Sequence, residues 1–302
     1  MEKTGIKKKK LRKNTKRMRR VKRSSGLFIA PSFLGVLVFF LIPFAVVVFY
    51  SLVDNPISKN FVELDNFKYI LENNAFKRAM TNTFKFSMVA VPLAVLLSLL
   101  LAILLDIKLP FRSQFRTFFL SPMMVPVASI VLIWQVLFSY NGAVNEVLLH
   151  FGVDKIDWLK SEYAQVVIVV LFLWKNLGYN MILFMAALAS IPKDIIEVAR
   201  LESANSLQIF FYIKIRYLSS TFMFVTIMSL INSFKVFREV YLLTTDYPYE
   251  TIYLLQHFMN NTFRNLDYQK LSSAAVLMSM VMVVIIGILF LVENYLGKDV
   301  EG

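Results

Sequence analysis

Five polar side chains interrupt two otherwise apolar stretches of the chain: Asn176, Tyr179, Ser229, Asn232 and Ser233. Their hydroxyl and amide groups both donate and accept hydrogen bonds, which suits a ligand rich in hydroxyl groups. Polar groups within an apolar run are costly where they face lipid, so we expect them to face inward and line a solute path. Hydrogen bonding between neighbouring helices is the other open interpretation of each residue.

The chain lacks the residue patterns of an enzyme or a metal site. It contains no Cys, and its two histidines, His150 and His257, lie far apart in sequence, so each is expected at the surface or in a loop. A nucleotide-binding loop requires Gly-x4-Gly-Lys-Ser/Thr, and only Gly297 and Gly302 have the glycine spacing, without the Lys. We therefore predict no catalytic residue, no metal ligand, no cofactor and no ATPase site in this chain.

The surrounding sequence is apolar enough to build membrane spans. Hydrophobic residues make up 57% of the chain, and the mean hydropathy is +0.60. A span needs about 20 mostly apolar residues. The sequence therefore predicts an all-α, polytopic membrane protein with one transmembrane domain over 27–297. Pro122 and Pro126 are expected to bend or interrupt the third span. The six segments that meet the length are 27–53, 82–106, 115–139, 164–189, 218–243 and 272–296.

Basic residues are concentrated at the N-terminus. Residues 1–25 carry 13 Lys and Arg against one acid, Glu2. A basic tail beside a span is held by anionic lipid on the cytoplasmic side, so we expect lipid and not nucleic acid as its partner. With the 1–26 tail inside, the inner segments, tail included, carry 21 Lys and Arg against 9 on the outer segments, as the positive-inside rule requires. This predicts a multi-pass membrane protein with a cytoplasmic N-terminus and a cytoplasmic tail over 298–302.

A charged segment, 191–218, separates the fourth and fifth apolar runs. Asp194 and Glu197 have the spacing of a capping box that opens a helix. An amphipathic helix held between two spans suits contact with a partner at the membrane face, although lying on lipid is an open alternative. Apolar and small residues at three- and four-residue spacing predict one stripe of this helix, formed by Ile196, Ala199, Ser203, Leu207 and Phe210.

This segment resembles the cytoplasmic coupling motif of bacterial ABC importer permeases. Glu202 stands where an Asp is usual, and Val198, Ser203 and Arg216 depart from the motif. Ser203 replaces a Gly that lets the backbone turn between two short helices, which leaves the sharpness of the turn open. The positions that match the motif are Glu197, Ala199, Ala204, Phe210 and Ile213.

The resemblance extends over Leu27 to Leu296. Trp174 to Pro192 and Asn232 to Thr244 resemble the sugar-importer permeases of the maltose and multiple-sugar type. The resemblance implies a type I ABC importer permease whose sugar site lies on the fourth and fifth spans, and it carries over best at Tyr179 and Ser229. It also implies an ATPase-coupling role for the segment, with Glu197 as a polar contact and Ala199 and Ala204 as close-packing positions. The coupling residues are Glu197, Ala199, Arg200, Glu202, Ser203 and Ala204.

Family membership of this type implies a location in the bacterial cell membrane and four partners. These are a second homologous permease, a dimer of ABC ATPases that bind ATP and Mg, an extracytoplasmic sugar-binding protein, and a carbohydrate substrate. A gradient-driven secondary transporter of a small polar solute is the alternative. Such a carrier usually has a titrating carboxylate or His at depth. The middle of each predicted span lacks one, which favours the ATP-driven importer.

Overall fold

The structure, a computed structural model, describes residues 29–106 and 111–296. The predicted tails, 1–26 and 298–302, lie outside the described residues. Within those ranges the chain is helical apart from its loops, and a single bridge pairs Val53 with Phe61. This confirms the predicted all-α fold with six spans. The helices that are long and apolar enough to cross a membrane are Ile29–Ser51, Asn74–Asp106, Val127–His150, Ala164–Ala189, Ser219–Thr244 and Tyr268–Asn294.

The chain divides into two compact units. Of the described residues, the smaller unit comprises 29–67 and 268–276, and the larger comprises 68–106, 111–267 and 277–296. In the smaller unit, a π-helical turn (Leu37–Leu41) leads into α2 (Ile42–Ser51). The carbonyl oxygen of Ser51 accepts hydrogen bonds from Asn66 Nδ2 at 3.1 Å and Ser273 Oγ at 3.3 Å. These bonds tie the end of α2 to the first turns of α3 (Asp65–Glu72) and α15 (Tyr268–Leu296).

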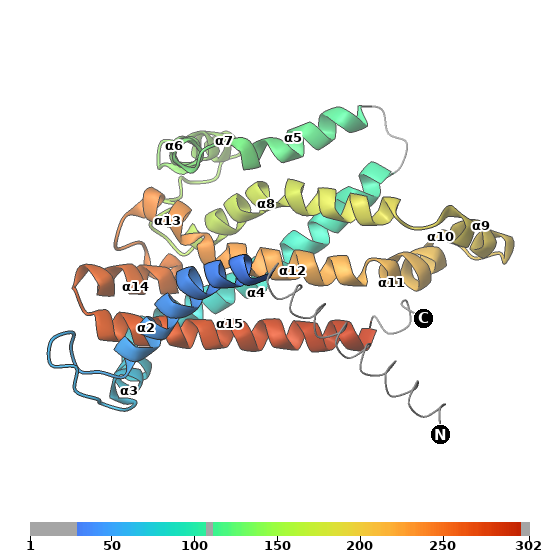
Figure 1. Cartoon of the computed structure of the whole chain (residues 1–302). Helices are drawn as coiled ribbons and strands as arrows, with labels where there is room; N and C mark the ends of the chain where they lie inside the picture. The colour runs from blue at the N-terminus through green and yellow to red at the C-terminus, as the bar shows by residue number, and fades with distance from the viewer. Residues whose placement is uncertain (1–28, 107–110, 297–302) are drawn as a thin grey trace, which may run out of the picture. The chain divides into compact units, whose positions relative to one another are not determined.

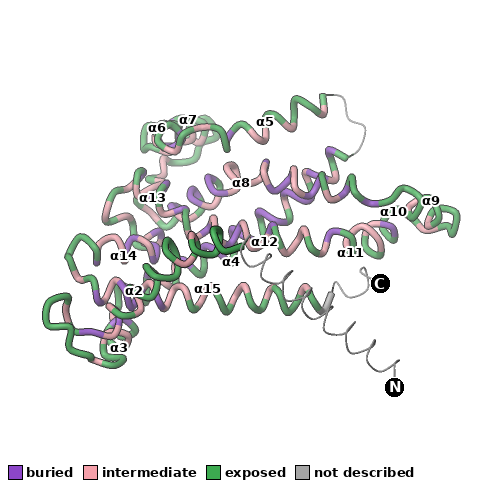
Figure 2. Tube along the Cα trace, in the orientation of Figure 1, coloured by how far each residue is buried: buried purple, intermediate pink, exposed green. Residues whose placement is uncertain are grey.

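The larger unit is a helix bundle centred on α4 and α8 (Figure 1). α12 packs against both of these helices, α5 runs along α8, α14 lies against α4, and α13 lies against α6. Figure 2 shows that buried residues gather in α4, α8 and α12. The bounds are α4 (Asn74–Asp106), α5 (Arg112–Met124), α6 (Val127–Phe138), α7 (Ala143–His150), α8 (Ala164–Ala189), α12 (Ser219–Lys235), α13 (Phe237–Thr244) and α14 (Leu255–Arg264).

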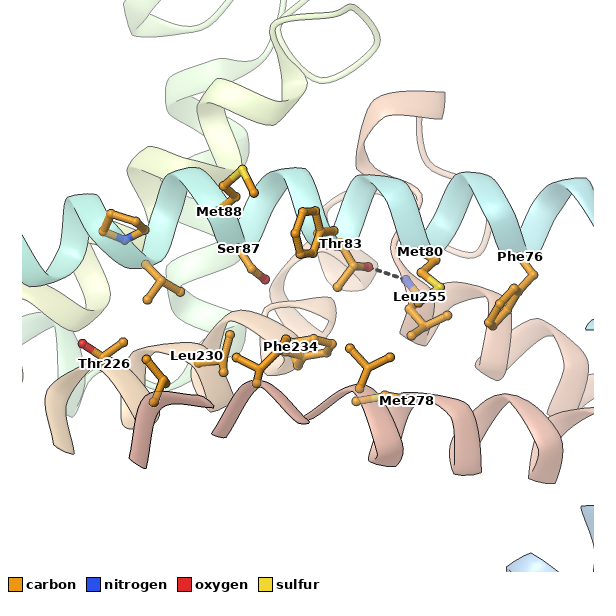
Figure 3. A pocket seen from close by; sticks show the side chains of 16 residues that line it. Phe76, Met80, Thr83, Ser87, Met88, Thr226, Leu230, Phe234, Leu255 and Met278 are labelled. Carbon is orange, nitrogen blue, oxygen red and sulfur yellow. Dashed lines mark hydrogen bonds between the residues drawn. The ribbon is translucent and has the colours of Figure 1, made fainter. Parts of the chain in front are cut away.

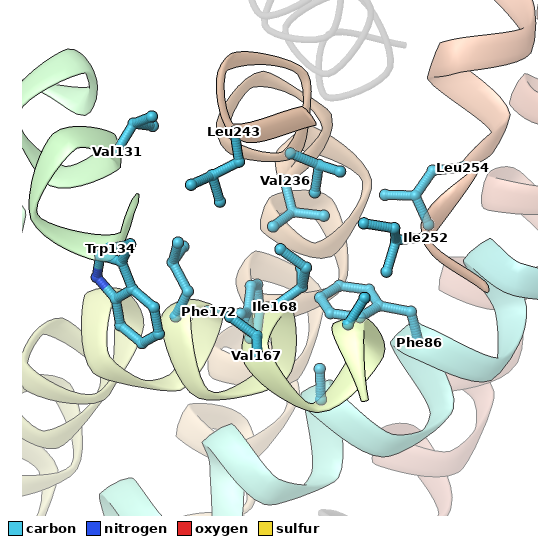
Figure 4. Close-up of a cluster of buried hydrophobic side chains, with 14 of the residues drawn as sticks. Phe86, Val131, Trp134, Val167, Ile168, Phe172, Val236, Leu243, Ile252 and Leu254 are labelled. Atoms are coloured by element: carbon cyan, nitrogen blue, oxygen red, sulfur yellow. The ribbon is translucent and has the colours of Figure 1, made fainter. Parts of the chain in front are cut away.

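Two hydrophobic clusters hold this bundle together. The first joins α4, α6, α8 and α13, and its rings of Phe86 and Phe172 meet edge to face at 5.6 Å (Figure 4). The second joins α4, α8 and α12 around Met181, Phe184 and Val225. Both α4 and α8 contribute to the two clusters, so the core fixes their positions, and α8 carries two of the predicted path residues.

The third predicted span, 115–139, is wrong in its bounds. α5 ends at Met124, Val125 is extended with φ −81° and ψ 131°, and a new helix begins after Pro126. Proline has no amide hydrogen to donate and disfavours a helical conformation in the residue before it, so the chain breaks here. The predicted interruption is thus confirmed at Pro126, whereas Pro122 stays within α5. The fifth span is also two helices, divided at Val236.

The segment 191–218 is not the single helix that its spacing predicts. α9 (Lys193–Leu201) is followed by a turn, a short α10 (Ser206–Gln208), a π-helical stretch over Ile209–Lys214 and α11 (Ile215–Tyr217). Its stripe is therefore broken, and Leu207 is exposed.

The capping box predicted for this segment is also wrong. Pro192 is the N-cap of α9 and Asp194 already lies inside the first turn, so no side-chain cap forms. The capping box of this segment opens α10 instead. There the backbone N–H of Gln208 donates to Asn205 Oδ1, and the N–H of Asn205 donates to Gln208 Oε1, both at 2.8 Å.

Candidate functional site

A cavity of about 720 Å³ opens between α8, the α12–α13 break and the α5–α6 break. Three of the five predicted path residues, Asn176, Tyr179 and Asn232, line it. The other lining side chains and backbone segments come from Met123–Val127, Leu171, Phe172, Lys175, Met228, Lys235, Val236, Arg238 and Glu239. Its wall is therefore a mixture of apolar surface and convergent polar groups, the usual composition of a small-molecule site.

Asn176 and Asn232 are joined across the wall of the cavity. Asn232 Nδ2 donates to Asn176 Oδ1 at 2.9 Å, and Asn176 Nδ2 donates to the carbonyl oxygen of Phe172 at 2.8 Å. These bonds hold both amides in one orientation and link α8 to α12. Tyr179 is half-buried one turn further along α8. An amide pair and a phenol on one wall can exchange hydrogen bonds with the hydroxyl groups of a polyol.

Ser229 and Ser233 lie away from this cavity. Ser229 is 1% exposed, and its Oγ accepts a hydrogen bond from Asn180 Nδ2 at 2.9 Å. The hydroxyl groups of Ser233 and Ser87 share a hydrogen bond of 2.8 Å. These contacts join α12 to α8 and to α4, as hydroxyl groups commonly do between membrane helices.

Sequence reasoning missed a buried ion pair in the same wall. Glu239, on α13, is 3% exposed, and its carboxylate accepts a hydrogen bond from Lys175 Nζ on α8. The other carboxylate oxygen, Oε2, is buried without a hydrogen-bond partner in the described residues. Lys175 was visible as a charge within an apolar run, but its partner lies at a separation of 64 residues. No local spacing connects the two.

Close packing between α5 and α8 sets the position of this wall. A Cβ atom added at Gly178 would overlap the backbone carbonyl of Phe119. Only glycine permits the two backbones to approach this closely. Gly178 lies between the cavity-lining residues Asn176 and Tyr179, so the contact fixes how far the polar face of α8 stands from α5.

A second cavity, of about 280 Å³, has a different character (Figure 3). Apolar side chains of α4, α12 and α15, with Leu255 of α14, make up most of its lining. Two of its hydroxyl groups are already engaged: Thr83 Oγ1 accepts a hydrogen bond from the Leu255 N–H at 2.8 Å, and Ser87 is bonded to Ser233. This cavity therefore offers few groups to a polar solute.

His257 is buried in α14, so its expected position at the surface or in a loop is wrong. The side chain is 1% exposed, its ring meets that of Phe237 edge to face at 4.6 Å, and Nδ1 accepts a hydrogen bond from the Leu254 N–H at 3.2 Å. Burial lowers the pKa of His257 to about 4, against the opposing effect of Asp246. Its role is to join α14 to α13. No three His, Cys, Asp or Glu side chains in the described ranges cluster as metal ligands.

At the other end of the larger unit, α9 and α10 form a turn that projects from the bundle (Figure 1). Ser203 adopts a left-handed conformation with φ 61°, the one that the expected Gly would favour. The backbone N–H of Ala204 then donates to the carbonyl oxygen of Ala199 at 2.9 Å. The sharp turn is thus present despite the Ser, and it brings the two predicted small residues together.

The outer surface of this turn is mixed in character. Glu197, Arg200 and Glu202 are exposed, and so are large apolar side chains such as Val198 (57%) and Leu201 (84%). A shallow hollow of about 320 Å³ lies beside the turn, lined by Glu202, Ser203, Ala204, Gln208, Ile209, Tyr212 and Ile213. Exposed apolar groups rimmed by charges are typical of protein–protein contact sites.

The turn is anchored to the bundle by its flanking charges. Lys214 Nζ lies 3.8 Å from Asp106 Oδ2, and Arg112 Nη2 lies 3.7 Å from Asp106 Oδ1. Asp106 is the last residue of α4, so it connects the coupling segment to the ends of α4 and α5.

Comparisons with known proteins agree with this architecture. The lactose transport system permease protein of Rhizobium radiobacter is 31% identical over 281 residues, which cover 90% of this chain and 93% of the relative. The sn-glycerol-3-phosphate transport system permease protein of Escherichia coli is 28% identical over 265 residues, covering 86% of this chain and 90% of the relative.

A solved structure shares the fold. It is a bacterial alginate ABC transporter in complex with an alginate pentasaccharide-bound periplasmic protein, similar with a TM-score of 0.79 and 21% identity over 93% of this chain and 98% of that chain. Residues 94–302 match the family described as "Binding-protein-dependent transport system inner membrane component". The predicted resemblance to importer permeases is confirmed, and this multi-pass membrane protein belongs to the family of inner membrane components of binding-protein-dependent transport systems.

Proposed function

We propose that this chain is one permease subunit of an ATP-driven carbohydrate importer, and that 191–218 couples it to a separate ATPase. One observation carries the proposal: the coupling segment is joined in the chain to both helices that bear the amides of the cavity. α8, which carries Asn176, is joined to α9 by the short link 190–192, and α11 leads through Leu218 into α12, which carries Asn232. A displacement of the turn would therefore move both walls of the cavity.

The substrate class is supported by chemistry and by relatives. The amides of Asn176 and Asn232 and the phenol of Tyr179 match the alternating donors and acceptors of sugar hydroxyl groups. Among the relatives, one is named for lactose transport and another, from Bacillus subtilis, for arabinooligosaccharide transport; the second is 27% identical over 233 residues.

The remaining machinery would lie on other subunits. A second, homologous permease would complete the path, and an extracytoplasmic binding protein would deliver the sugar. Two ATPase subunits would hold ATP and Mg, while this chain would have no ATPase site of its own. In this arrangement the N-terminus and the coupling turn are cytoplasmic. The contact would use Glu197, Arg200 and Glu202 as polar groups, with Ser203 at the turn and Ala199 and Ala204 packed closely beneath it.

Movement would pass through the two helices that flank the turn. Closure of the ATPases would press on α9 and α10, and the rigid α8 and α12 would tilt as a consequence. The breaks at Val125–Pro126 and Val236 line the cavity and are points where the backbone can change direction. Tilting about them would open the cavity first to one side of the membrane and then to the other.

Copurification and uptake test this proposal together. An affinity-tagged form of this chain, extracted gently from its native membrane, should bring down a second permease and an ATPase. Proteoliposomes that contain the complex and the binding protein should accumulate carbohydrate only when ATP is supplied on the ATPase side. Solute uptake that follows an ion gradient and persists without ATP would contradict the proposal and favour a secondary transporter.

A further inference from the structure

The polar cavity carries an excess of positive charge. Four charged side chains line it: Lys175, Lys235, Arg238 and Glu239. Lys175 is neutralised by its ion pair with Glu239. Lys235 and Arg238 are exposed, and neither forms an ion pair or side-chain hydrogen bond with another residue of the described ranges. The cavity thus presents two unneutralised cations.

These cations lie within a membrane-spanning segment. Both belong to Ser219–Thr244, and at 1.5 Å per residue Lys235 stands about 24 Å along this helix from Ser219. The hydrocarbon core of a bilayer is about 30 Å thick, so a helix that crosses it from Ser219 onward would carry Lys235 inside the bilayer. A charge at this depth is costly in lipid and normally faces an aqueous path or an opposite charge.

The two cations also stand beside the predicted sugar-binding groups. Lys235 follows Asn232 by three residues on α12, and both side chains line the cavity. Arg238 is the second residue of α13, across the break at Val236. One ligand can therefore reach the amide of Asn232 and both cations from within a single cavity.

We propose that the transported carbohydrate is acidic, and that Lys235 and Arg238 bind its carboxylate or phosphate group. This inference rests on the proposed function. An Arg guanidinium matches the two oxygen atoms of a carboxylate or phosphate, and a Lys ammonium adds a compact second charge. A cleft lined by one sign of charge within low-dielectric walls concentrates ligands of the opposite sign. The amides and Tyr179 bind the hydroxyl groups of the same molecule.

The test uses the complete transporter in proteoliposomes: this chain with its copurifying permease, ATPases and binding protein. Three labelled probes are compared: a digalacturonate, which carries carboxylates; glycerol 3-phosphate, which carries a phosphate ester; and lactose, which is neutral. ATP-dependent uptake of one anionic probe should exceed that of lactose at least tenfold. The identity of that probe distinguishes a carboxylate from a phosphate ester as the recognised group.

Substitutions then assign the effect to the two cations. Lys235→Met and Arg238→Met should each raise the KM for the anionic probe roughly tenfold, since each removes a charge-assisted hydrogen bond. Lys235→Arg and Arg238→Lys should restore most of the uptake. Lys85→Met is the matched control, because Lys85 is an exposed lysine of α4 outside this cavity, and uptake should be unaffected.

Salt dependence gives a second readout that needs no variant. Salt screens attraction between accessible charges, so the KM of the wild-type transporter for the anionic probe should rise with ionic strength. Uptake of lactose alone, uptake of none of the probes by an intact complex, or unchanged anionic uptake in the Lys235→Met/Arg238→Met variant would overturn the inference. Each of those results leaves the proposed function intact. The proposed function is contradicted by a different result, namely that no ATPase and no second permease copurify with this chain.

Discussion

Lys175 Nζ donates a hydrogen bond to the carboxylate of Glu239, and this pair connects α8 to α13 at the cavity wall. The two partners are unequally accessible: the Glu239 side chain is 4% exposed, whereas that of Lys175 is 31% exposed. If the ion pair is broken, water in the cavity can therefore solvate the ammonium group of Lys175, but it cannot reach the carboxylate of Glu239 equally well.

This inequality predicts that the two single substitutions differ in cost. Removing one member of a buried pair costs about 3 kcal/mol or more, because the other charge stays buried without a partner. Lys175→Met should therefore lower the melting temperature of the detergent-solubilised protein more than Glu239→Gln does. The double variant Lys175→Met/Glu239→Leu should recover part of the loss, and the comparison is made by thermal unfolding.

The exposed pair Arg78–Glu250 provides the control for that comparison. Its side chains are 52% and 71% exposed, and exposed pairs contribute about 0 to 1 kcal/mol. Glu250→Gln should leave the melting temperature nearly unchanged. Equal effects of Lys175→Met, Glu239→Gln and Glu250→Gln would show that the pair in the cavity wall is not structurally important.

Gly178 should tolerate no side chain at all. Ala at this position would force its Cβ atom against the backbone of Phe119, and overpacking of this kind costs about 1–3 kcal/mol. Gly178→Ala should lower both the melting temperature and the yield of assembled protein. Gly287→Ala on α15 is the matched control, because a Cβ there meets no atom within 4 Å, and it should be neutral or slightly stabilising. Equal melting temperatures for the two variants would disprove the close approach of α5 and α8.

The sequence predicted the membrane helices well, because hydropathy depends on composition and not on contacts. It missed helix ends that extend beyond the apolar run: α4 begins at Asn74, eight residues before the predicted 82, since helical backbone continues past the apolar region. The π-helical and capping details of 191–218 were also missed. There Pro192 fixes where α9 begins, and the left-handed conformation of Ser203 makes the turn after it. The spacing of apolar side chains carries no information about either backbone conformation.

The candidate path was predicted only in part, for a geometric reason. Ser229 and Asn232 are three residues apart, which separates their directions on a helix by about 60°. That rotation is enough to turn Ser229 toward Asn180 and Asn232 toward the cavity. Sequence spacing cannot determine the rotation of a helix this finely. The pairing of Lys175 with Glu239 could not be predicted for the same reason, since it depends on how α8 and α13 pack.

His257 should make the stability of the protein depend on pH. The folded protein holds its pKa at about 4, whereas the ordinary value is 6.5. Between these values the unfolded chain binds a proton that the folded chain does not, so stability is lost as the pH falls from about 6.5 to 4. The full loss is about 3 kcal/mol. The melting temperature of the wild-type protein should therefore fall as the pH is lowered from 6.5 to 4.

Two variants separate His257 from other titrating groups. His257→Gln keeps an acceptor for the Leu254 N–H but does not titrate, so its melting temperature should vary less between pH 6.5 and 4. His150→Gln should keep the wild-type pH dependence, because His150 is exposed. A pH dependence that is the same in His257→Gln as in the wild type would assign the effect elsewhere, with Asp246 as the nearest candidate.

Glu197→Lys should abolish transport while the protein remains in the membrane. Glu197 is exposed on α9 and is bonded to nothing within the described chain, so reversing its charge should not unfold the subunit. It should instead prevent docking of the ATPase, measured as loss of copurification and of ATP-dependent uptake. Glu162→Lys, at another exposed acid, is the control and should transport normally. Normal uptake by the Glu197→Lys variant would show that Glu197 is not needed for coupling to the ATPase.

The most direct test of the whole account uses the absence of cysteine from this chain. Ser203→Cys places a single thiol at the tip of the coupling turn. A membrane-impermeant maleimide should label it in inside-out vesicles and not in right-side-out ones, and a short bifunctional reagent should join it to a copurifying ATPase subunit. Labelling from the outside, or a cross-link that never includes a nucleotide-hydrolysing subunit, would contradict the account.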